Sequence, residues 1–201
     1  MKNNFKLVFF VSVWLALNSA PAWPENECVE VTLGTVQLSV PKQHMTPTTP
    51  RKDNSGNFIF AFDSTVPGIE CVGGCKELFV NISSTSPTPE QNWIYIKPKL
   101  TGRTSGTYRI YDDPLFRGTP KYLWEILVPS DVARPQDEFY VCTPEGRVVN
   151  PGCNIKVVTK SGLVAAFSIR RKVLSRARDA ASFVTQSINQ FSENHVKGTC
   201  K

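Results

Sequence analysis

The sequence predicts an α+β fold in which an antiparallel sheet, in one or two pieces, packs against one long C-terminal amphipathic helix. Two observations support this prediction. Apolar and polar residues alternate in several short segments, which is the pattern of half-buried strands. Near the C-terminus, apolar residues instead recur at steps of three and four, which is the pattern of a helix with one apolar face.

Short alternating segments mark the strands expected in the first half of the chain. These segments are 29–33, 36–40, 58–62, 78–82 and 93–96. Gly34-Thr35 separates the first two, which form either two short strands or one bent strand. The segments 42–56 and 83–89 are rich in Pro, Ser and Thr, so we expect exposed loops there.

The second half continues the alternation and ends in the helix. Its expected strands are 108–111, 121–128, 138–142, 155–158 and 163–167. A helix is expected to begin near Ile169, because an apolar face then continues for about five turns. This face must pack on the sheet, and it consists of Leu174, Ala177, Ala181, Val184, Ile188 and Phe191.

Residues 1–22 have the pattern of a secretory signal peptide. Lys2 and Lys6 give a positively charged start, 7–17 is an apolar run, and Ala20-Pro21-Ala22 is a small-x-small cleavage pattern. The apolar run is too short to span a bilayer stably. We therefore expect the signal to be removed after Ala22.

The expected domain organisation follows from that cleavage. Residues 23–201 are predicted to form a single α+β domain in the periplasm, or outside the cell if the source is not Gram-negative. A division into two sub-lobes, 23–90 and 91–201, is the second arrangement open to this length. No stable membrane insertion is expected after signal cleavage.

All six cysteines lie after the expected signal, and an even number in an exported chain predicts three disulfides. They are Cys28, Cys71, Cys75, Cys142, Cys153 and Cys200, and six cysteines allow 15 pairings. Closeness in sequence favours Cys71–Cys75 and Cys142–Cys153, which leaves Cys28 to pair with Cys200. A metal site is not expected, because the chain has two histidines and no pair of CxxC spacings.

Several classes of function are disfavoured by the sequence. The net charge of +6 falls to +4 once the expected signal with Lys2 and Lys6 is removed, and a charge this mild does not favour nucleic acid as a partner. The sequence has neither a G-x-S-x-G motif nor a phosphate-binding glycine loop, and we expect no catalytic residues and no cofactor. An exported enzyme that uses Asp112, Asp113 or Glu125 remains an alternative, and it predicts that changing them abolishes activity without unfolding the protein.

Aromatic residues around Asp112-Asp113-Pro114 are the best candidates for a binding surface, since Tyr, Trp and Arg often carry interface energy. The candidate partner-binding residues are Tyr108, Tyr111, Asp112, Asp113, Phe116, Arg117, Tyr122 and Trp124. Alternate aromatic residues of a strand could equally fill the core. A basic cluster at 170–178 opposes the dipole of the expected helix, and either an acidic partner or a solvated helix face would explain it.

Both ends of the chain resemble exported immunity proteins of type VI secretion effectors, especially the phospholipase effectors. The segment from Val36 to Met45 is similar to the strand and "IPKxYL" start of those proteins. The segment 58–62, followed by Val66-Pro67-Gly68, is similar to their second strand and its turn. The Cys142–Cys153 hairpin and the last helix are similar to their cysteine-bridged hairpin and C-terminal helix.

The resemblance implies a Gram-negative periplasmic protein that binds an incoming toxin and blocks its active site. The partner would be a toxic effector encoded nearby, and this chain would need no catalytic residues of its own. The alternative function is a secreted structural or adhesin-like interaction module, which would assemble with itself or with envelope components. Tight one-to-one binding of a toxin would distinguish the first function from the second.

Overall fold

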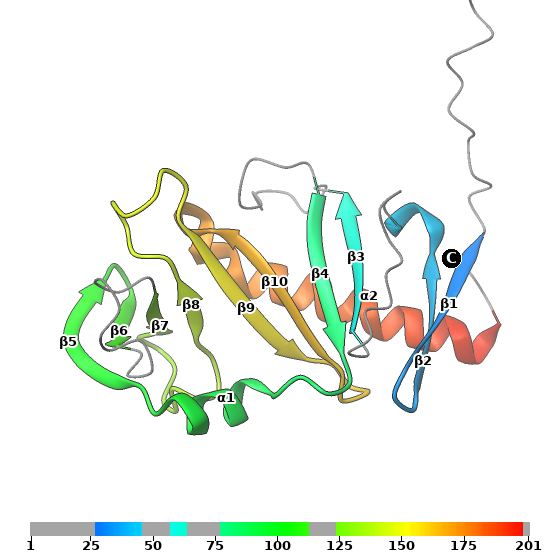
Figure 1. Ribbon diagram of the computed structural model, residues 1–201, viewed down its shortest axis with the longest axis horizontal. Coiled ribbons are helices and arrows are strands. Elements are labelled where there is room, and N and C mark those ends of the chain that lie inside the picture. The colour runs from blue at the N-terminus through cyan, green and yellow to red at the C-terminus, as the bar shows by residue number, and fades with distance from the viewer. Residues whose placement is uncertain (1–26, 46–56, 64–76, 113–123, 199–201) are drawn as a thin grey trace, which may run out of the picture.

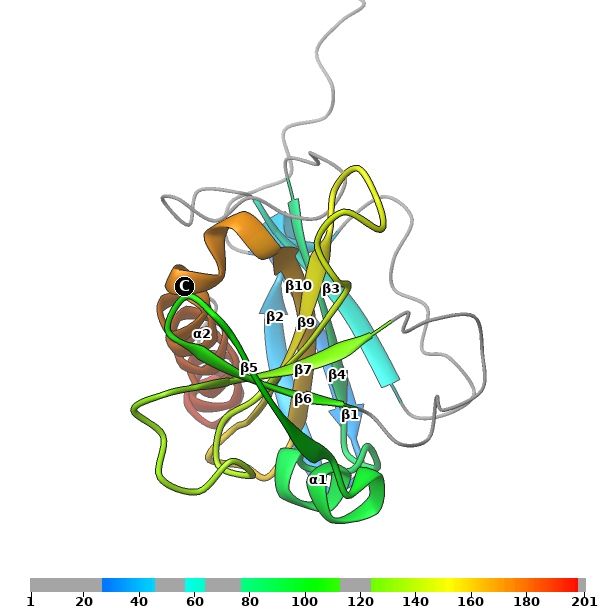
Figure 2. The same ribbon diagram turned by 90° about the vertical axis from the view of Figure 1, so that its left-hand side faces the viewer.

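The structure is a computed structural model, and it describes residues 27–45, 57–63, 77–112 and 124–198. These residues form the predicted α+β fold, with an eight-stranded antiparallel sheet, a separate two-stranded hairpin and a long C-terminal helix. The helix, α2 (Ala177–Lys197), crosses behind the large sheet and reaches the hairpin (Figure 1). Seen from the side, α2 lies on one face of the sheet (Figure 2).

The elements have the following bounds. The hairpin consists of β1 (Cys28–Leu33) and β2 (Val36–Pro41), and the short 3-10 helix η1 (Lys42–His44) follows it. The strands of the large sheet are β3 (Asn57–Asp63), β4 (Glu77–Ser83), β5 (Lys99–Ser105), β6 (Tyr108–Asp112), β7 (Glu125–Pro129), β8 (Tyr140–Cys142), β9 (Gly152–Val158) and β10 (Val164–Arg170). The remaining helices are α1 (Pro89–Ile96) and η3 (Arg171–Arg176).

The order of strands in the large sheet is β3-β4-β10-β9-β8-β7-β6-β5. The last strand, β10, pairs with β4, so strands from the first and second halves of the chain are neighbours. Both predicted sub-lobes contribute to this one sheet, and the assignment of domain boundaries stays a prediction. The expected signal at 1–22 lies outside the described residues. No helix within the described part of the chain is long and apolar enough to cross a membrane.

The main core lies between α2 and the face of the sheet that α2 covers, which is called the inner face below. Phe60 and Phe62 of β3 are almost fully buried there. Their rings lie 5.8 Å from Phe191 and 5.0 Å from Phe183, respectively, in edge-to-face geometry. Burying each large apolar side chain contributes roughly 1.5–3 kcal/mol, so this aromatic cluster is a main anchor of α2.

The hairpin β1–β2 packs on α2, and within the described ranges it forms no ladder with the large sheet. Leu38 and Val40 of β2 are fully buried in the same core. Near the end of α2, His195 contacts Glu30 through Nδ1 at 2.7 Å and Gln37 through Nε2 at 2.6 Å. The hairpin therefore depends on the C-terminal half of α2 for its position.

The predicted strand at 93–96 is wrong, because these residues belong to α1. Thr88 and Gln91 form a capping box: the Thr88 hydroxyl accepts from the Gln91 N–H at 3.2 Å, and the Gln91 side chain accepts from the Thr88 N–H at 2.9 Å. Pro89 stands at the first helical position, which favours a helix start. These signals outweigh the short alternation of apolar residues that follows.

Helix α1 covers the outer face of the sheet at its β6–β8 end. Trp93 packs edge-to-face against Tyr111 and Phe139, with ring centroids 5.2 and 5.1 Å apart. A second buried cluster of Tyr111, Ile126 and Val128 lies beneath the helix. The sheet is therefore covered on its inner face by α2 and, over part of its outer face, by α1.

The C-terminal helix begins later than the sequence predicts. Ile169 pairs with Cys153 and extends β10, so the chain leaves the sheet only after Arg170. The 3-10 helix η3 then precedes α2, in which Ala180 is fully buried and the predicted Ala181 is partly buried against the same core. Strand β5 was not predicted, because most of its residues are exposed and no alternation marks it.

The predicted disulfide between Cys142 and Cys153 is confirmed, with an S–S distance of 2.07 Å. The two residues are direct cross-strand partners of β8 and β9, and both are fully buried. Cys28 is also disulfide-bonded. Cys71, Cys75 and Cys200 lie outside the described residues, so the pairings Cys71–Cys75 and Cys28–Cys200 stay predictions.

Candidate binding surface

The predicted partner-binding tyrosines do not lie on one surface. Tyr108 points to the inner face, where its hydroxyl donates to the Leu174 carbonyl at 3.1 Å and its ring lies 6.1 Å from that of Tyr140. Tyr111 points to the outer face and is buried beside Trp93. Side chains alternate between the two faces of a strand, so residues three apart point to opposite faces. Both faces of the sheet are covered here, and both tyrosines therefore take part in packing.

Asp112 and Trp124 are the described members of the predicted surface that stay accessible. They line a cavity of about 500 Å³ together with Arg103 and Arg147. The Asp112 carboxylate accepts from Arg103 at 3.3 Å, and Trp124 is 38% exposed. The remaining predicted residues, Asp113, Phe116, Arg117 and Tyr122, lie outside the described residues, so their part in binding stays a prediction.

Glu125, which the enzyme alternative would use, forms a buried ion pair inside the fold. Its carboxylate accepts from Arg171, and both side chains are buried. Arg171 also donates to the Thr143 carbonyl at 2.9 Å. The carboxylate is therefore neutralised inside the protein. No group of three or more residues that could bind a metal occurs in the part of the chain that the structure describes.

Much of the basic cluster at 170–178 is paired with carboxylates of the same chain. Arg176 donates to Asp179 at 2.6 Å. Arg178 donates to Asp131 at 2.7 Å and forms an ion pair with Glu138 at 2.8 Å. Hydrogen bonds to these two carboxylates raise the pKa of Arg178, and the bond from Arg178 lowers the pKa of Asp131. Internal partners thus explain these charges without an external anion.

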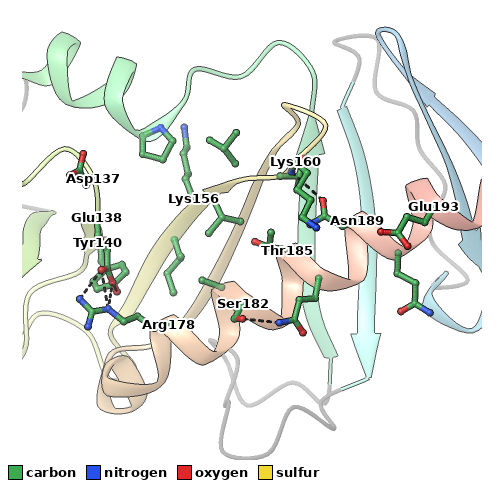
Figure 3. A pocket seen from close by; sticks show the side chains of 18 of the residues that line it. Asp137, Glu138, Tyr140, Lys156, Lys160, Arg178, Ser182, Thr185, Asn189 and Glu193 are labelled. Atoms are coloured by element: carbon green, nitrogen blue, oxygen red, sulfur yellow. Dashed lines mark hydrogen bonds and ion pairs between the residues drawn. The ribbon is translucent and has the colours of Figure 1, made fainter.

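A long groove opens between β9, α2 and the chain that leads into β8 (Figure 3). Its origin is the shortness of β8, which pairs with β9 only through Val141–Asn154 and Cys142–Cys153. Before Tyr140, the chain turns toward α2, where Glu138 binds Arg178. The two backbones therefore diverge, and the groove lies between them.

The groove has a volume of about 1360 Å³. One wall is the run 155–160, the opposite wall is 137–140, and Pro89 lies on the α1 side. Polar residues of α2 form the floor, among them Ser182, Thr185, Gln186, Asn189, Gln190 and Glu193. Pockets for small molecules usually measure about 300–1,000 Å³, so the size of the groove suits a segment of polypeptide better.

Two lysines of the groove have no anionic partner among the described residues. Lys156 is half-buried, and this burial lowers the pKa of its ammonium group. Lys160 lies at the turn between β9 and β10, where its backbone N–H donates to Asn189 at 3.2 Å (Figure 3). The other cations of the groove have carboxylate partners, as in the pair Lys197–Glu193 at 3.6 Å. The groove therefore carries a surplus of positive charge.

The fold is similar to that of a solved structure, Smlt3025, an immunity protein of the Stenotrophomonas maltophilia type IV secretion system. The TM-score is 0.53 at 13% sequence identity, and the match covers 83% of this chain and 94% of that one. At this identity the likeness shows a common fold over most of both chains. No family model and no curated protein matches the sequence.

The neighbour belongs to the class that the sequence resemblance named, but to a type IV and not a type VI secretion system. Of the residues that line the groove, Arg178 alone belongs to a group that the sequence marked as a possible contact with a partner, the basic cluster at 170–178. Lys156 looks like an ordinary solvent-facing residue of an alternating strand, and the groove exists because two strands diverge in space. The predicted strands at 138–142 and 155–158 have nearly the same length, so the sequence did not indicate that β8 (Tyr140–Cys142) is much shorter than β9 (Gly152–Val158).

Proposed function

We propose that this protein is an exported immunity protein, which binds a toxic effector enzyme and neutralises it. The observation that carries the proposal is the agreement of two independent likenesses. The sequence resembles immunity proteins at both ends, and the fold is similar to that of Smlt3025, which is an immunity protein. The two likenesses come from different kinds of information, sequence motifs and backbone geometry.

Two features support an exported location. The Cys142–Cys153 disulfide is typical of oxidising compartments such as the periplasm. The pattern at 1–22 is that of a signal peptide. N-terminal sequencing of protein recovered from the periplasm should begin at Trp23. A protein that stays in the cytoplasm with residues 1–22 attached would contradict this part of the proposal.

The proposed action is stoichiometric binding, in which this chain covers a surface that the toxin needs for its activity. The accessible candidates are the groove beside β9 and the cavity lined by Asp112 and Trp124. The sequence resemblance points to a type VI phospholipase effector, whereas the solved neighbour serves a type IV system. We therefore propose as the partner a toxic effector that a secretion system delivers and that is encoded nearby, and the proposal does not depend on the type of that system.

The decisive experiment is capture of the neighbouring gene products by the mature, oxidised protein. Any captured enzyme is then assayed alone and with increasing amounts of this protein. Capture with complete inhibition at a one-to-one ratio is expected. Failure to capture, or capture without inhibition, would contradict the proposal. Self-association in light scattering, without toxin binding, would favour the structural or adhesin-like module instead.

A further inference from the structure

We propose that the toxin inserts an extended, acidic segment into the groove and adds it as a strand to the free edge of β9. The inference rests on the proposed function, because the partner is the effector that the protein neutralises. β-strand addition of this kind is a common mode of peptide recognition.

Part of β9 has a neighbouring strand on one side only. Its ladder with β10 runs from Gly152 to Val158. Its ladder with β8 on the other side ends at Asn154. Beyond Asn154, the β8-facing edge of β9 has no strand partner among the described residues. Such an edge presents free N–H and C=O groups to any extended chain that can reach it.

The hydrogen-bond pattern identifies which backbone groups are free. The N–H of Thr143 donates to the Gly152 carbonyl at 2.8 Å, so Gly152 turns its backbone groups toward the β8 side. Backbone direction alternates along a strand, and Lys156 and Val158 therefore face that side too. The backbone groups of Ile155 and Val157 instead point toward β10, where these residues lie opposite Phe167 and Ala165. A bound strand would hydrogen-bond to Lys156 and Val158.

The edge of β9 also has room for an added strand. Neighbouring strands lie about 4.7–4.9 Å apart, so an added strand needs an open channel along the edge. The groove lies along this edge, because the run 155–160 forms its wall. Ser182, Thr185 and Asn189 of α2 extend toward the channel and offer hydrogen-bonding groups to the inner side of a bound segment (Figure 3).

The charge of the groove favours an acidic segment. Lys156 is half-buried without a carboxylate partner among the described residues, and Lys160 lies farther along the same wall, at the turn after β9. A carboxylate of the bound segment would stabilise the ammonium group of Lys156, which burial disfavours. Complementary charge therefore selects an acidic segment and rejects a basic one.

A lysine at a free strand edge also has a simpler explanation, since it guards the edge against unwanted pairing. The two roles predict different results. If Lys156 is only a guard, the edge stays open in the complex, and changing the lysine leaves toxin affinity unaltered. If the edge binds the toxin, the amides of Lys156 and Val158 become protected on binding.

The test is amide hydrogen exchange of the mature protein, resolved by residue, with and without the captured toxin. The amides of Lys156 and Val158 should exchange rapidly in the free protein and slowly in the complex. The amides of Ile155 and Val157 are the internal control, because their partners in β10 should protect them in both states. A toxin complex in which Lys156 and Val158 still exchange rapidly would overturn the inference and leave the proposed function intact.

Charge is tested with Lys156→Glu and Lys160→Glu, and each should weaken toxin binding by tenfold or more. Lys156→Met, which keeps the apolar stem, should weaken it less. Lys99→Glu is the matched control, because Lys99 is exposed on β5, at the far edge of the sheet. Equal affinity for all these variants would contradict the acidic nature of the segment.

A probe that does not depend on the toxin separates the two proposals. A synthetic peptide of alternating Glu and Val should protect the amides of Lys156 and Val158 at high concentration, and a peptide of alternating Lys and Val should not. If no neighbouring toxin binds but the acidic peptide protects these amides, the edge binds acidic strands and the immunity function fails. If neither toxin nor acidic peptide protects them, the inference is overturned.

Discussion

Arg171 and Glu125 form a buried ion pair that joins the start of η3 to β7, with side chains 5% and 9% exposed. The two residues are 46 positions apart in the sequence. Arg171 also donates to the Thr143 carbonyl at 2.9 Å, next to the disulfide-bonded Cys142. The pair thus fixes the point at which the chain leaves the sheet and begins its C-terminal helices.

Replacing Glu125 by Gln should destabilise the protein, because the buried Arg171 would lose its buried carboxylate partner and keep the largely exposed carboxylate of Glu145 at 3.4 Å. We expect the free energy of unfolding to fall by about 3–5 kcal/mol, measured by urea denaturation. Arg176→Ala is the control, since its ion pair with Asp179 is exposed and should contribute little. Full stability of Glu125→Gln, with an activity lost, would instead support the enzyme alternative.

Removing the disulfide with the double substitution Cys142→Ala and Cys153→Ala should lower the free energy of unfolding by about 2–4 kcal/mol. The cross-link closes a loop with a sequence separation of 11, which restricts the unfolded chain. Thermal unfolding of the two proteins under oxidising conditions measures the difference. An unchanged midpoint would show that the hairpin β8–β9 is held by packing and pairing alone.

His44 should make the protein less stable in mild acid. Its ring lies 5.0 Å from Phe62 and 5.7 Å from Phe191, and burial lowers its pKa below the ordinary value of 6.5. As the pH falls below 6.5, the unfolded chain binds a proton before the folded protein does, so stability falls. Unfolding between about pH 7.5 and 5.5 should show this loss, and His44→Leu should reduce it. An identical pH dependence in both proteins would contradict the assignment.

The capping box should matter for the position of α1. Thr88→Ala removes the acceptor for the Gln91 N–H and should cost about 1 kcal/mol of stability. The fluorescence of Trp93 should also change, because α1 places this ring against Tyr111 and Phe139. Thr88→Ser keeps the acceptor and should behave like the natural protein. Equal losses for Ala and Ser would mean that the methyl group, and not the hydroxyl, stabilises the helix start.

Local patterns predicted most of the strands. The alternation of Phe58, Phe60 and Phe62 marks β3, and all three rings are buried as expected. The same approach failed at 93–96, where four residues are too few to distinguish a strand from a helix turn. Thr88 and Gln91, which form the capping box of α1, are the residues in the sequence that indicate a helix start there.

The candidate binding residues were predicted less well than the fold. Tyr108 and Tyr111 are close in sequence, but opposite faces of β6 place them in different parts of the core. The groove was not predicted, because its lining comes from segments around residues 89, 138, 156 and 185. A pattern within one segment carries no information about where another segment ends.

The sequence by itself determined the fold class, the amphipathic C-terminal helix and the pairing of Cys142 with Cys153. Each of these depends on contacts within one element or across one hairpin, which local periodicity and spacing record. Only the tertiary structure decided the strand order, the pairing of Arg171 with Glu125 and the free edge of β9. These depend on how far each ladder extends, and the packing of distant segments sets that length.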